Sequence, residues 1–212
     1  MKVCEIFTSI QGESTYAGMP CTFIRLSGCN LRCSYCDTKY SYEEGVEMSI
    51  GTIMKKVEDA GVGLVEITGG EPLLQQKEML DLTAILIDAG FRVLIETNGT
   101  VSIRPIDNRA VVIMDVKTPA SGMSEKNDFS NFDSIQQKDE IKFVLSGRDD
   151  YAWSRKIVQD YGLAKRCTVL FSPAYGTLSP RELAGWIIED RLDVRLNMQL
   201  HKYIFTPDER MV

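Results

Sequence analysis

Short runs of β-branched and aromatic residues alternate with longer amphipathic segments along most of the chain. The apolar runs predict strands at residues 21–27, 64–68, 92–96, 111–115, 142–146, 168–171 and 194–198. The helical period predicts helices at residues 49–60, 75–89, 149–161 and 179–189. This alternation is typical of an α/β fold in which helices cover a parallel sheet.

Local signals refine this picture. Ser49 and Ser179 suit helix N-caps, and Pro180 suits a first helical turn. Residues 118–138 are rich in Ser, Asn, Asp and Lys and have no helical period, so we expect an extended loop or short helices there. Because no repeat or linker interrupts the pattern, we predict a single domain over residues 1–212, whose sheet is open or partly closed.

Residues with chemical potential follow the ends of the predicted strands. They are the cysteine loop at 28–38 and the motifs TGGEP at 68–72, ETNGT at 96–100, DVKTP at 115–119, LSGRD at 145–149 and FSP at 171–173. In parallel α/β folds, ligands bind at the carboxyl edge of the sheet. We therefore expect these loops to face one common cleft.

Composition limits the kinds of partner. A net charge of -6 and a pI near 5.0 argue against a broad basic surface for nucleic acid or anionic membrane and favour a small substrate. A hydrophobic fraction of 44% is enough for a sizeable core. No apolar run reaches the roughly 20 residues that span a bilayer, and the start, MKVCEIFTSIQGE, lacks a secretory profile. We expect a cytoplasmic protein with reduced thiols.

Three of the six cysteines are spaced as C-x3-C-x2-C, at Cys29, Cys33 and Cys36. Closely spaced thiolates on a loop can hold a compact iron–sulfur cluster, and three ligands for four irons leave one iron open to a cofactor or substrate. The alternative is a zinc site, which needs a fourth ligand in a chain with one histidine. The separate thiols of Cys4, Cys21 and Cys167 are expected to be small buried hydrophobes.

The cysteine spacing and the motif Gly69-Gly70-Glu71-Pro72 resemble the radical S-adenosylmethionine superfamily. The resemblance implies a partial (β/α)6 TIM-like barrel with reduced helical cover. It also implies a 4Fe-4S cluster whose open iron is chelated by S-adenosylmethionine, which is cleaved to a 5'-deoxyadenosyl radical. Gly70 and Glu71 would position the methionine end of this cofactor. Taken alone, the motif could be a turn in which Glu71 caps a helix.

Within this superfamily, EIFTSIQGE at 5–13, FIRL at 23–26 and CDT at 36–38 resemble the 7-carboxy-7-deazaguanine synthase family, as does QLHK at 199–202. The resemblance implies conversion of 6-carboxy-5,6,7,8-tetrahydropterin to 7-carboxy-7-deazaguanine with loss of ammonia, a step in queuosine and 7-deazapurine biosynthesis. It implies that the radical removes hydrogen from C6 of the pterin, and that S-adenosylmethionine is regenerated.

The same resemblance implies the substrate contacts. Gln11 and the backbone at Ile10 and Gly12 would bind the pterin ring, Glu13 its guanidine-like end, and Arg25 its carboxylate. Without the resemblance, Gln11 would be interpreted as a turn residue and Arg25 as half of a surface ion pair.

Further ligand roles are implied for single side chains. Thr38 would bind a Mg2+ ion that also touches the substrate, and Thr68 would contact the substrate. His201, as the lone histidine, is either a packed residue or a substrate ligand. The family often ends near a C-terminal residue that reaches the substrate, and here Pro207 is followed by DERMV. The implied contacts to S-adenosylmethionine are Tyr35, Cys36, Asp37, Gly70, Ser146, Gly147, Arg148, Phe171, Ser172 and Pro173.

Two alternatives stay open. A glycyl-radical-enzyme activase is similarly short but lacks the IQGE opening and the CDT continuation. An iron–sulfur electron carrier or redox sensor would need neither GGEP nor an open iron. The resemblance also implies a homodimer and a flavodoxin- or ferredoxin-type electron donor.

Overall fold

The computed structural model describes residues 1–206 and 209–212. Its strands form one sheet in the order β3-β1-β2-β4-β5-β6-β7-β8-β9. They are β1 (Lys2–Ile10), β2 (Pro20–Leu26), β3 (Val46–Glu47), β4 (Leu64–Gly69), β5 (Arg92–Thr97), β6 (Val111–Val116), β7 (Glu140–Leu145), β8 (Thr168–Pro173) and β9 (Arg195–Leu196). The helices are α1 (Ile50–Ala60), α2 (Gln76–Asp88), α3 (Arg148–Asp160), α4 (Pro180–Glu189) and α5 (His201–Ile204).

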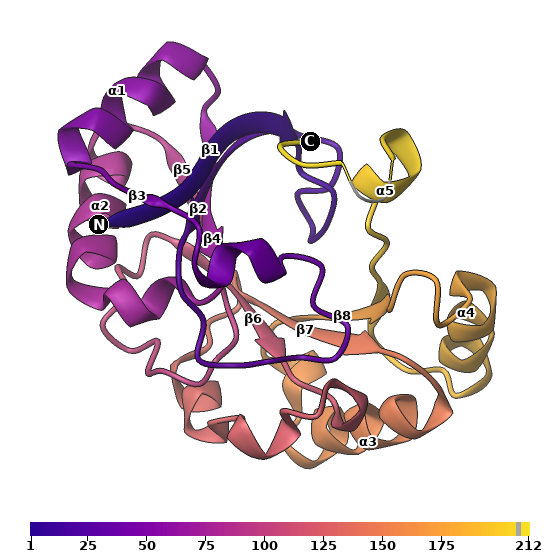
Figure 1. Ribbon diagram of the computed structural model, residues 1–212. Helices are drawn as coiled ribbons and strands as arrows, with labels where there is room; N and C mark the ends of the chain where they lie inside the picture. Colours follow the sequence, from indigo (N-terminus) through magenta and orange to yellow (C-terminus); the bar gives the residue numbers. More distant parts are fainter. Residues whose placement is uncertain (207–208) are drawn as a thin grey trace.

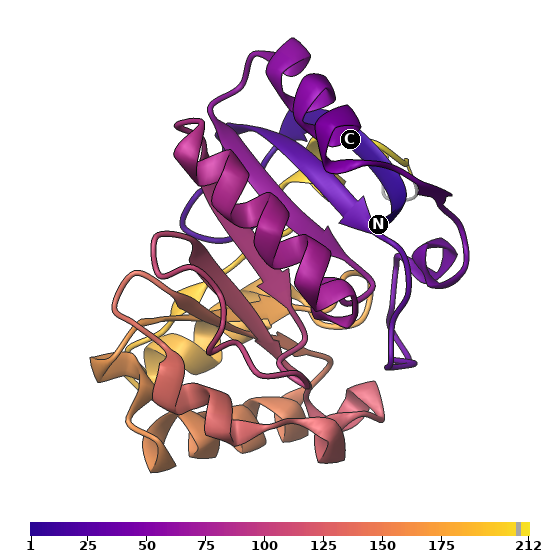
Figure 2. The ribbon, with the colours of Figure 1, turned by 90° about the vertical axis from the view of Figure 1, so that its left-hand side faces the viewer.

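The sheet is parallel from β2 onwards and curves around a central space (Figure 1). β1 is antiparallel to both of its neighbours, β2 and β3. Figure 2 shows α1 and α2 side by side on the outer face of the sheet. The six strands β2, β4, β5, β6, β7 and β8 correspond to the partial (β/α)6 barrel expected from the sequence, and β9 adds a short seventh parallel strand. The α/β prediction is confirmed.

Local signals explain where the helices begin. The hydroxyl of Ser49 accepts a hydrogen bond from the Thr52 amide at 3.1 Å, so the predicted N-cap of α1 is confirmed. Ser179 occupies the N-cap position of α4 without a side-chain hydrogen bond, and Pro180 is the first helical residue. Residues 118–138 contain the short 3-10 helices η3 (Pro119–Ser121), η4 (Ser124–Lys126) and η5 (Phe129–Ser134). Of the two forms expected there, an extended loop or short helices, the structure has the short helices. The other 3-10 helices are η1 (Lys39–Tyr42), η2 (Pro72–Gln75) and η6 (Leu163–Lys165).

Apolar side chains fill both faces of the sheet in different ways. The larger buried cluster lies between the strands and the helices and includes Ile24, Ile67 and Ile95. A smaller cluster on the opposite face includes Phe23 and Ile113. Side chains alternate between the two faces of a strand. The strand residues that share a face with this smaller cluster therefore point into the interior of the curved sheet.

β1 was not among the strands predicted from the sequence, which treated the first residues only as a ligand-binding segment. It pairs along its whole length with β2, and the Arg25 and Glu5 side chains that face each other on these strands form an ion pair of 2.7 Å. A charged residue at Glu5 interrupts the apolar pattern, which explains why the strand was missed. Cys21 and Cys167 are buried as expected, whereas Cys4 is only partly buried.

The sheet does not close into a complete barrel, because β3 and β9 are its two edges. The loop at residues 11–19, between β1 and β2, bridges the gap instead. Its Ser14 amide donates to Oδ1 of Asn197 at 2.8 Å, and its Thr15 amide donates to Oε1 of Glu140 at 3.1 Å. The Leu200 amide donates to the Gly12 carbonyl at 2.8 Å. These bonds hold the loop across the interior, next to β7 and β9.

No helix in the described part of the chain is both long and apolar enough to cross a lipid bilayer.

Candidate active site

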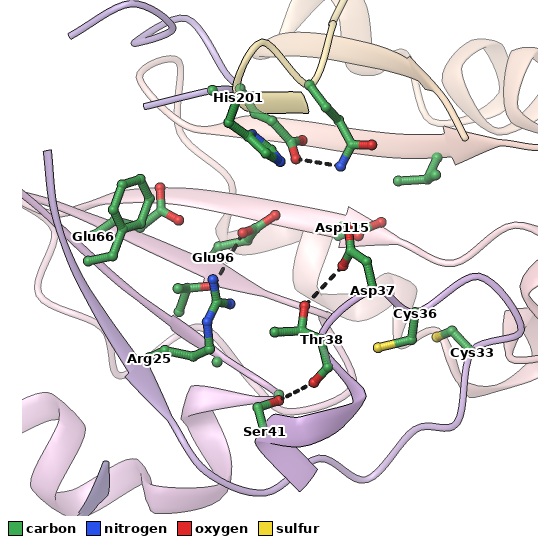
Figure 3. A pocket seen from close by; sticks show the side chains of 18 of the residues that line it. Arg25, Cys33, Cys36, Asp37, Thr38, Ser41, Glu66, Glu96, Asp115 and His201 are labelled. Atoms are coloured by element: carbon green, nitrogen blue, oxygen red, sulfur yellow. Dashed lines mark hydrogen bonds between the residues drawn. The ribbon is translucent and has the colours of Figure 1, made fainter. Parts of the chain in front are cut away.

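A cavity of about 970 Å³ occupies the carboxyl end of the curved sheet. Residues from the cysteine loop, the TGGEP turn, Glu96–Asn98 and the DVK segment line it together with the loop after β1 and the C-terminal segment. Figure 3 shows Cys33 and Cys36 at one end of this space and Glu66 at the other, with Arg25 and Thr38 between them in that view. The expected common cleft is therefore present, although residues 145–149 and 171–173 are not among those that line it.

The three spaced cysteines all line the cavity as free, partly buried thiols. Burial raises the pKa of Cys29 and of Cys33. Their loop is held in place by the Ser34 amide, which donates to the Ser121 carbonyl of η3 at 3.1 Å. The thiols therefore face a shared space from a fixed loop.

This arrangement fits an iron–sulfur cluster better than a zinc ion. Among residues 1–206 and 209–212, no three His, Cys, Asp or Glu side chains converge as ligands of one metal ion. Each cysteine of a cuboidal cluster binds a different iron, so the thiols need not meet at one point. A tetrahedral zinc site would require that convergence.

The TGGEP turn packs tightly against the cysteine loop, which explains its glycines. A Cβ on Gly70 would lie 2.2 Å from the Gly28 carbonyl oxygen and 2.7 Å from Cβ of Cys29. Gly69 has φ of 157° and would place a Cβ 2.3 Å from the Leu26 oxygen. Only glycine allows this approach, and it leaves the backbone of Gly70 at the cavity wall.

Glu71 is fully buried and does not line the cavity. Its carboxylate accepts from the Leu73 amide at 2.9 Å, the Thr97 hydroxyl at 2.8 Å and the Asn98 amide at 2.6 Å. Burial raises its pKa. The side chain thus caps η2 and joins the TGGEP turn to the loop after β5. The side chain therefore holds the turn in place from outside the cavity, and the role of Glu71 in positioning a cofactor stays a prediction.

Asp37 and Thr38 connect the cysteine loop to the C-terminal segment. The Thr38 hydroxyl donates to Oδ1 of Asp37 at 2.9 Å, and Nζ of Lys202 lies 2.6 Å from Oδ2 of Asp37. Burial alone would raise the pKa of Asp37, but the Lys202 ammonium and these hydrogen bonds lower it to about 2. The two side chains place carboxylate and hydroxyl oxygens, which magnesium prefers, at the cavity wall.

The middle of the cavity holds a network of buried and partly buried charges. Nζ of Lys142 lies 3.0 Å from Oε2 of Glu13 and 4.0 Å from Oδ2 of Asp115, and it also donates to Glu96. Burial alone would lower the pKa of Lys142, but Glu13 and Glu96 raise it well above its ordinary value. Asp115 pairs with Lys117 at 2.7 Å. Lys142 is therefore a permanent cation that holds carboxylates from several elements together.

The predicted substrate residues line the cavity outside the cysteine loop. Gln11 donates through Nε2 to Glu66 and accepts through Oε1 from the Glu13 amide at 3.0 Å. Nε of Arg25 donates to Glu5 at 2.7 Å. The Thr68 hydroxyl donates to Oε2 of Glu96 at 3.2 Å.

The imidazole of His201 packs against the backbone of Gly12, where a Cβ would lie 2.1 Å from its Nδ1. Burial lowers its pKa, so the ring is neutral near pH 7. Ile10, Gln11, Gly12, Glu13, Arg25, Thr68 and His201 all line the cavity.

Apart from Glu71, six of the residues predicted to contact S-adenosylmethionine lie outside the cavity lining. The Ser146 amide donates to Asp150 at 2.8 Å, and the Arg148 guanidinium lies 5.0 Å from the ring centroids of Tyr151 and Trp186. The Ser172 hydroxyl accepts from Asn197 at 2.8 Å. Gly147, Phe171 and Pro173 are likewise absent from the lining, whereas Tyr35, Cys36, Asp37 and Gly70 belong to it. The contacts of these residues to a cofactor stay predictions.

Glu66 and Lys142 line the cavity but were not predicted from the sequence. Each is the one charged residue of an otherwise apolar run, LVEIT at 64–68 and IKFVL at 141–145. A buried parallel strand has few places for a charge, so such a residue must face an interior polar space. That signal was available in the sequence. At the C-terminal end, Glu209, Arg210, Met211 and Val212 line the cavity, while Pro207 and Asp208 lie outside the described residues.

Comparison with known proteins identifies the class first. Residues 23–112 match the family described as the Radical SAM superfamily. The chain is 44% identical to the 7-carboxy-7-deazaguanine synthase of Koribacter versatilis over 100% of both chains. It is 43% identical to that of Chlorobaculum tepidum, with 100% of this chain and 97% of the relative covered.

The crystal structure of QueE from Escherichia coli superposes with a TM-score of 0.79 at 25% identity, covering 94% of each chain. The chain belongs to the 7-carboxy-7-deazaguanine synthase family. Membership of the radical SAM class implies a 4Fe-4S cluster and S-adenosylmethionine as cofactors.

Proposed function

We propose that the protein converts 6-carboxy-5,6,7,8-tetrahydropterin to 7-carboxy-7-deazaguanine with loss of ammonia, in queuosine or another 7-deazapurine pathway. The observation that supports this most is the two-ended cavity. Its thiol end suits a cluster, and the remainder of its lining includes Gln11, Glu13 and Arg25, which suit an amide edge and a carboxylate.

Cys29, Cys33 and Cys36 would hold the 4Fe-4S cluster, with Tyr35, Asp37 and Gly70 beside the cofactor. When bound, cluster and S-adenosylmethionine supply the radical that removes a hydrogen atom from the substrate. The chain's own residues orient the substrate and exclude water from the radical. The backbone of the TGGEP turn forms the wall next to the cysteine loop and fixes the distance between these two parts.

Arg25 is the residue best suited to bind the substrate carboxylate. Its Nε is anchored on buried Glu5, which fixes the plane of the guanidinium group. The terminal nitrogens of such an anchored fork can bind a carboxylate through two parallel hydrogen bonds. Thr38 would bind a Mg2+ ion next to that carboxylate through its hydroxyl oxygen, which lies at the same wall and is oriented by its hydrogen bond to Asp37. Thr68 and His201 would complete the contacts to the ring.

We further infer a cytoplasmic homodimer that receives electrons from a flavodoxin- or ferredoxin-type donor. Family membership supports these three properties. Size-exclusion chromatography with light scattering tests the dimer, and replacing dithionite by each reduced donor protein tests the electron source.

The proposed reaction is tested with reconstituted, dithionite-reduced protein under anaerobic conditions. S-adenosylmethionine, Mg2+ and 6-carboxytetrahydropterin are added, and products are followed by mass spectrometry. We expect carboxydeazaguanine without net consumption of S-adenosylmethionine. Formation of 5'-deoxyadenosine alone would refute the substrate but keep the radical class, and irreversible use of one cofactor per product would refute the regeneration of the cofactor.

The cluster assignment has its own control. Cys33→Ala is expected to lose the iron of the reconstituted protein and all activity, because the cluster loses one of its three protein ligands. Cys167→Ala, at a buried thiol outside the cavity, is expected to keep both.

The magnesium site is tested in two ways, by removing Mg2+ with a chelator and by the variant Thr38→Ala. In both cases the KM for the pterin is expected to rise.

A further inference from the structure

Glu66 differs from the carboxylates that line the middle of the cavity. Lys142 pairs with Glu13 and Glu96, and Lys117 pairs with Asp115. Within the described residues, no cation lies at ion-pair distance from Glu66. Its partner is the neutral amide of Gln11, bound to Oε2.

The surroundings of Glu66 favour its uncharged form. Its register partners on the neighbouring strands are Phe23 of β2 and Leu94 of β5, both buried and apolar, and Glu66 itself is only 4% exposed. Burial raises its pKa to about 8. The carboxylates of Glu96 and Glu13 act in the same direction, while Lys142 and the Gln11 hydrogen bond act against it.

The hydrogen bonds define which groups remain available to a ligand. The Glu13 amide donates to Oε1 of Gln11, so the orientation of this side-chain amide is fixed and its Nε2 is directed to Oε2 of Glu66. A proton on the carboxyl group then resides on Oε1, which has no partner among the described residues. The Glu66 hydroxyl and the second Nε2–H of Gln11 are thus two adjacent donors at the cavity wall.

The wall beside these donors is flat and aromatic. Phe7 and Phe23 stack with their ring centroids 5.0 Å apart, and both line the cavity. Figure 3 places Glu66 at the end away from Cys33 and Cys36. A planar ligand that reaches from the cysteine loop to this wall would present its remote edge to Glu66.

We propose that Glu66 is a specificity-determining residue of this cavity, whose carboxyl hydroxyl, together with the Gln11 amide, hydrogen-bonds the carbonyl edge of a flat nitrogen heterocycle. The inference rests on the proposed function, and it assigns the remote edge of the pterin to this pair. A heterocycle with only hydrogen-bond donors at that edge would face the two donors of Glu66 and Gln11. It would be rejected, because the buried donors on both sides would stay without acceptors.

Two variants separate hydrogen bonding from charge. Glu66→Gln keeps an acceptor for Gln11 and a donor for the ligand but cannot ionise, whereas Glu66→Leu removes both. With the loaded enzyme and 6-carboxytetrahydropterin, Glu66→Leu is expected to raise KM roughly tenfold or more, with a smaller change in kcat. Glu66→Gln is expected to keep KM within about threefold of the wild type near pH 7.

The pH profile supplies a readout that a structural role would not change. Wild-type kcat/KM is expected to fall above about pH 8 as Glu66 loses its proton, and Glu66→Gln is expected to lack that fall. Glu140→Gln is the matched control. It changes another buried glutamate, whose pKa is also raised by burial, outside the cavity, and is expected to keep the wild-type profile.

The outcomes are distinct. Unchanged KM in Glu66→Leu would overturn the inference, and so would a Glu66→Gln variant as impaired as Glu66→Leu, since the charge would then be needed. If Glu66→Leu fails to fold, the Glu66→Gln pH profile alone decides. A wild-type protein that does not turn over the pterin would refute the proposed function, and the inference with it, before any variant is compared.

Discussion

Nζ of Lys142 lies 3.0 Å from Oε2 of Glu13, although the two residues are 129 positions apart in the sequence. The contact joins β7 to the loop that bridges the open side of the sheet. Gln199 and Asn197 also donate to Glu13, at 3.1 and 3.3 Å. One carboxylate therefore holds the loop, the interior strand and the C-terminal segment in a common arrangement around the cavity.

Removing the cation from this network should be costly. In Lys142→Met, the partly buried carboxylates of Glu13 and Glu96 lose the buried cation that they share, and we expect the free energy of unfolding to fall by about 3–5 kcal/mol. Chemical denaturation of the reconstituted protein measures this. Lys156→Met, which breaks an exposed pair with Asp160 on α3, is the control and should change stability by less than about 0.5 kcal/mol. Equal effects of both variants would contradict the buried network.

A second prediction concerns the TGGEP turn. Glu71→Ala leaves two backbone amides and the Thr97 hydroxyl without their acceptor in a fully buried site. We expect a loss of at least about 3 kcal/mol, because each unsatisfied buried donor costs roughly 1–3 kcal/mol. Thermal or denaturant unfolding checks it, with Glu78→Ala on the exposed face of α2 as the control. A loss below about 1 kcal/mol would show that the carboxylate is not the structural centre of this turn.

The bridging loop should depend on Asn197, which is buried and accepts from the Ser14 amide while donating to Ser172. Asn197→Ala is expected to destabilise the protein by about 2 kcal/mol and to increase hydrogen exchange of residues 11–18. Exchange followed by mass spectrometry measures the local effect. Asn108→Ala, at an exposed position, should leave exchange unchanged. Unaltered protection of the loop in Asn197→Ala would mean that other contacts hold it.

The raised pKa of Glu66 also predicts how stability depends on pH. Its ordinary value is 4.5 and burial raises it to about 8, so between these values the folded protein binds a proton that the unfolded chain has released. The contribution of Glu66 to the free energy of unfolding is therefore greatest below pH 4.5 and declines until about pH 8. Glu66→Gln does not titrate and should gain stability relative to the wild type across this range. A difference that stays constant with pH, measured by denaturant unfolding, would contradict it.

The sequence was sufficient for the strands and helices that have regular apolar patterns. β4, β5 and α1 lie within one or two residues of their predicted ranges, because β-branched runs and an N-cap such as Ser49 are local signals. β1 was missed because Glu5 and Ser9 break its apolar pattern, and its pairing with β2 and β3 stabilises it. The short β9 is likewise defined by its neighbour β8.

For the site, the sequence by itself determined the chemistry of the cysteine loop and the need for glycines in the TGGEP turn, since both depend on residues close together in the chain. Only the tertiary structure decided that Glu71 turns away from the cavity, that Lys142 neutralises Glu13 and Glu96, and that no cation among the described residues pairs with Glu66. The physical reason is that the charge state and direction of a buried side chain depend on partners brought together by folding from distant positions, which no local pattern specifies.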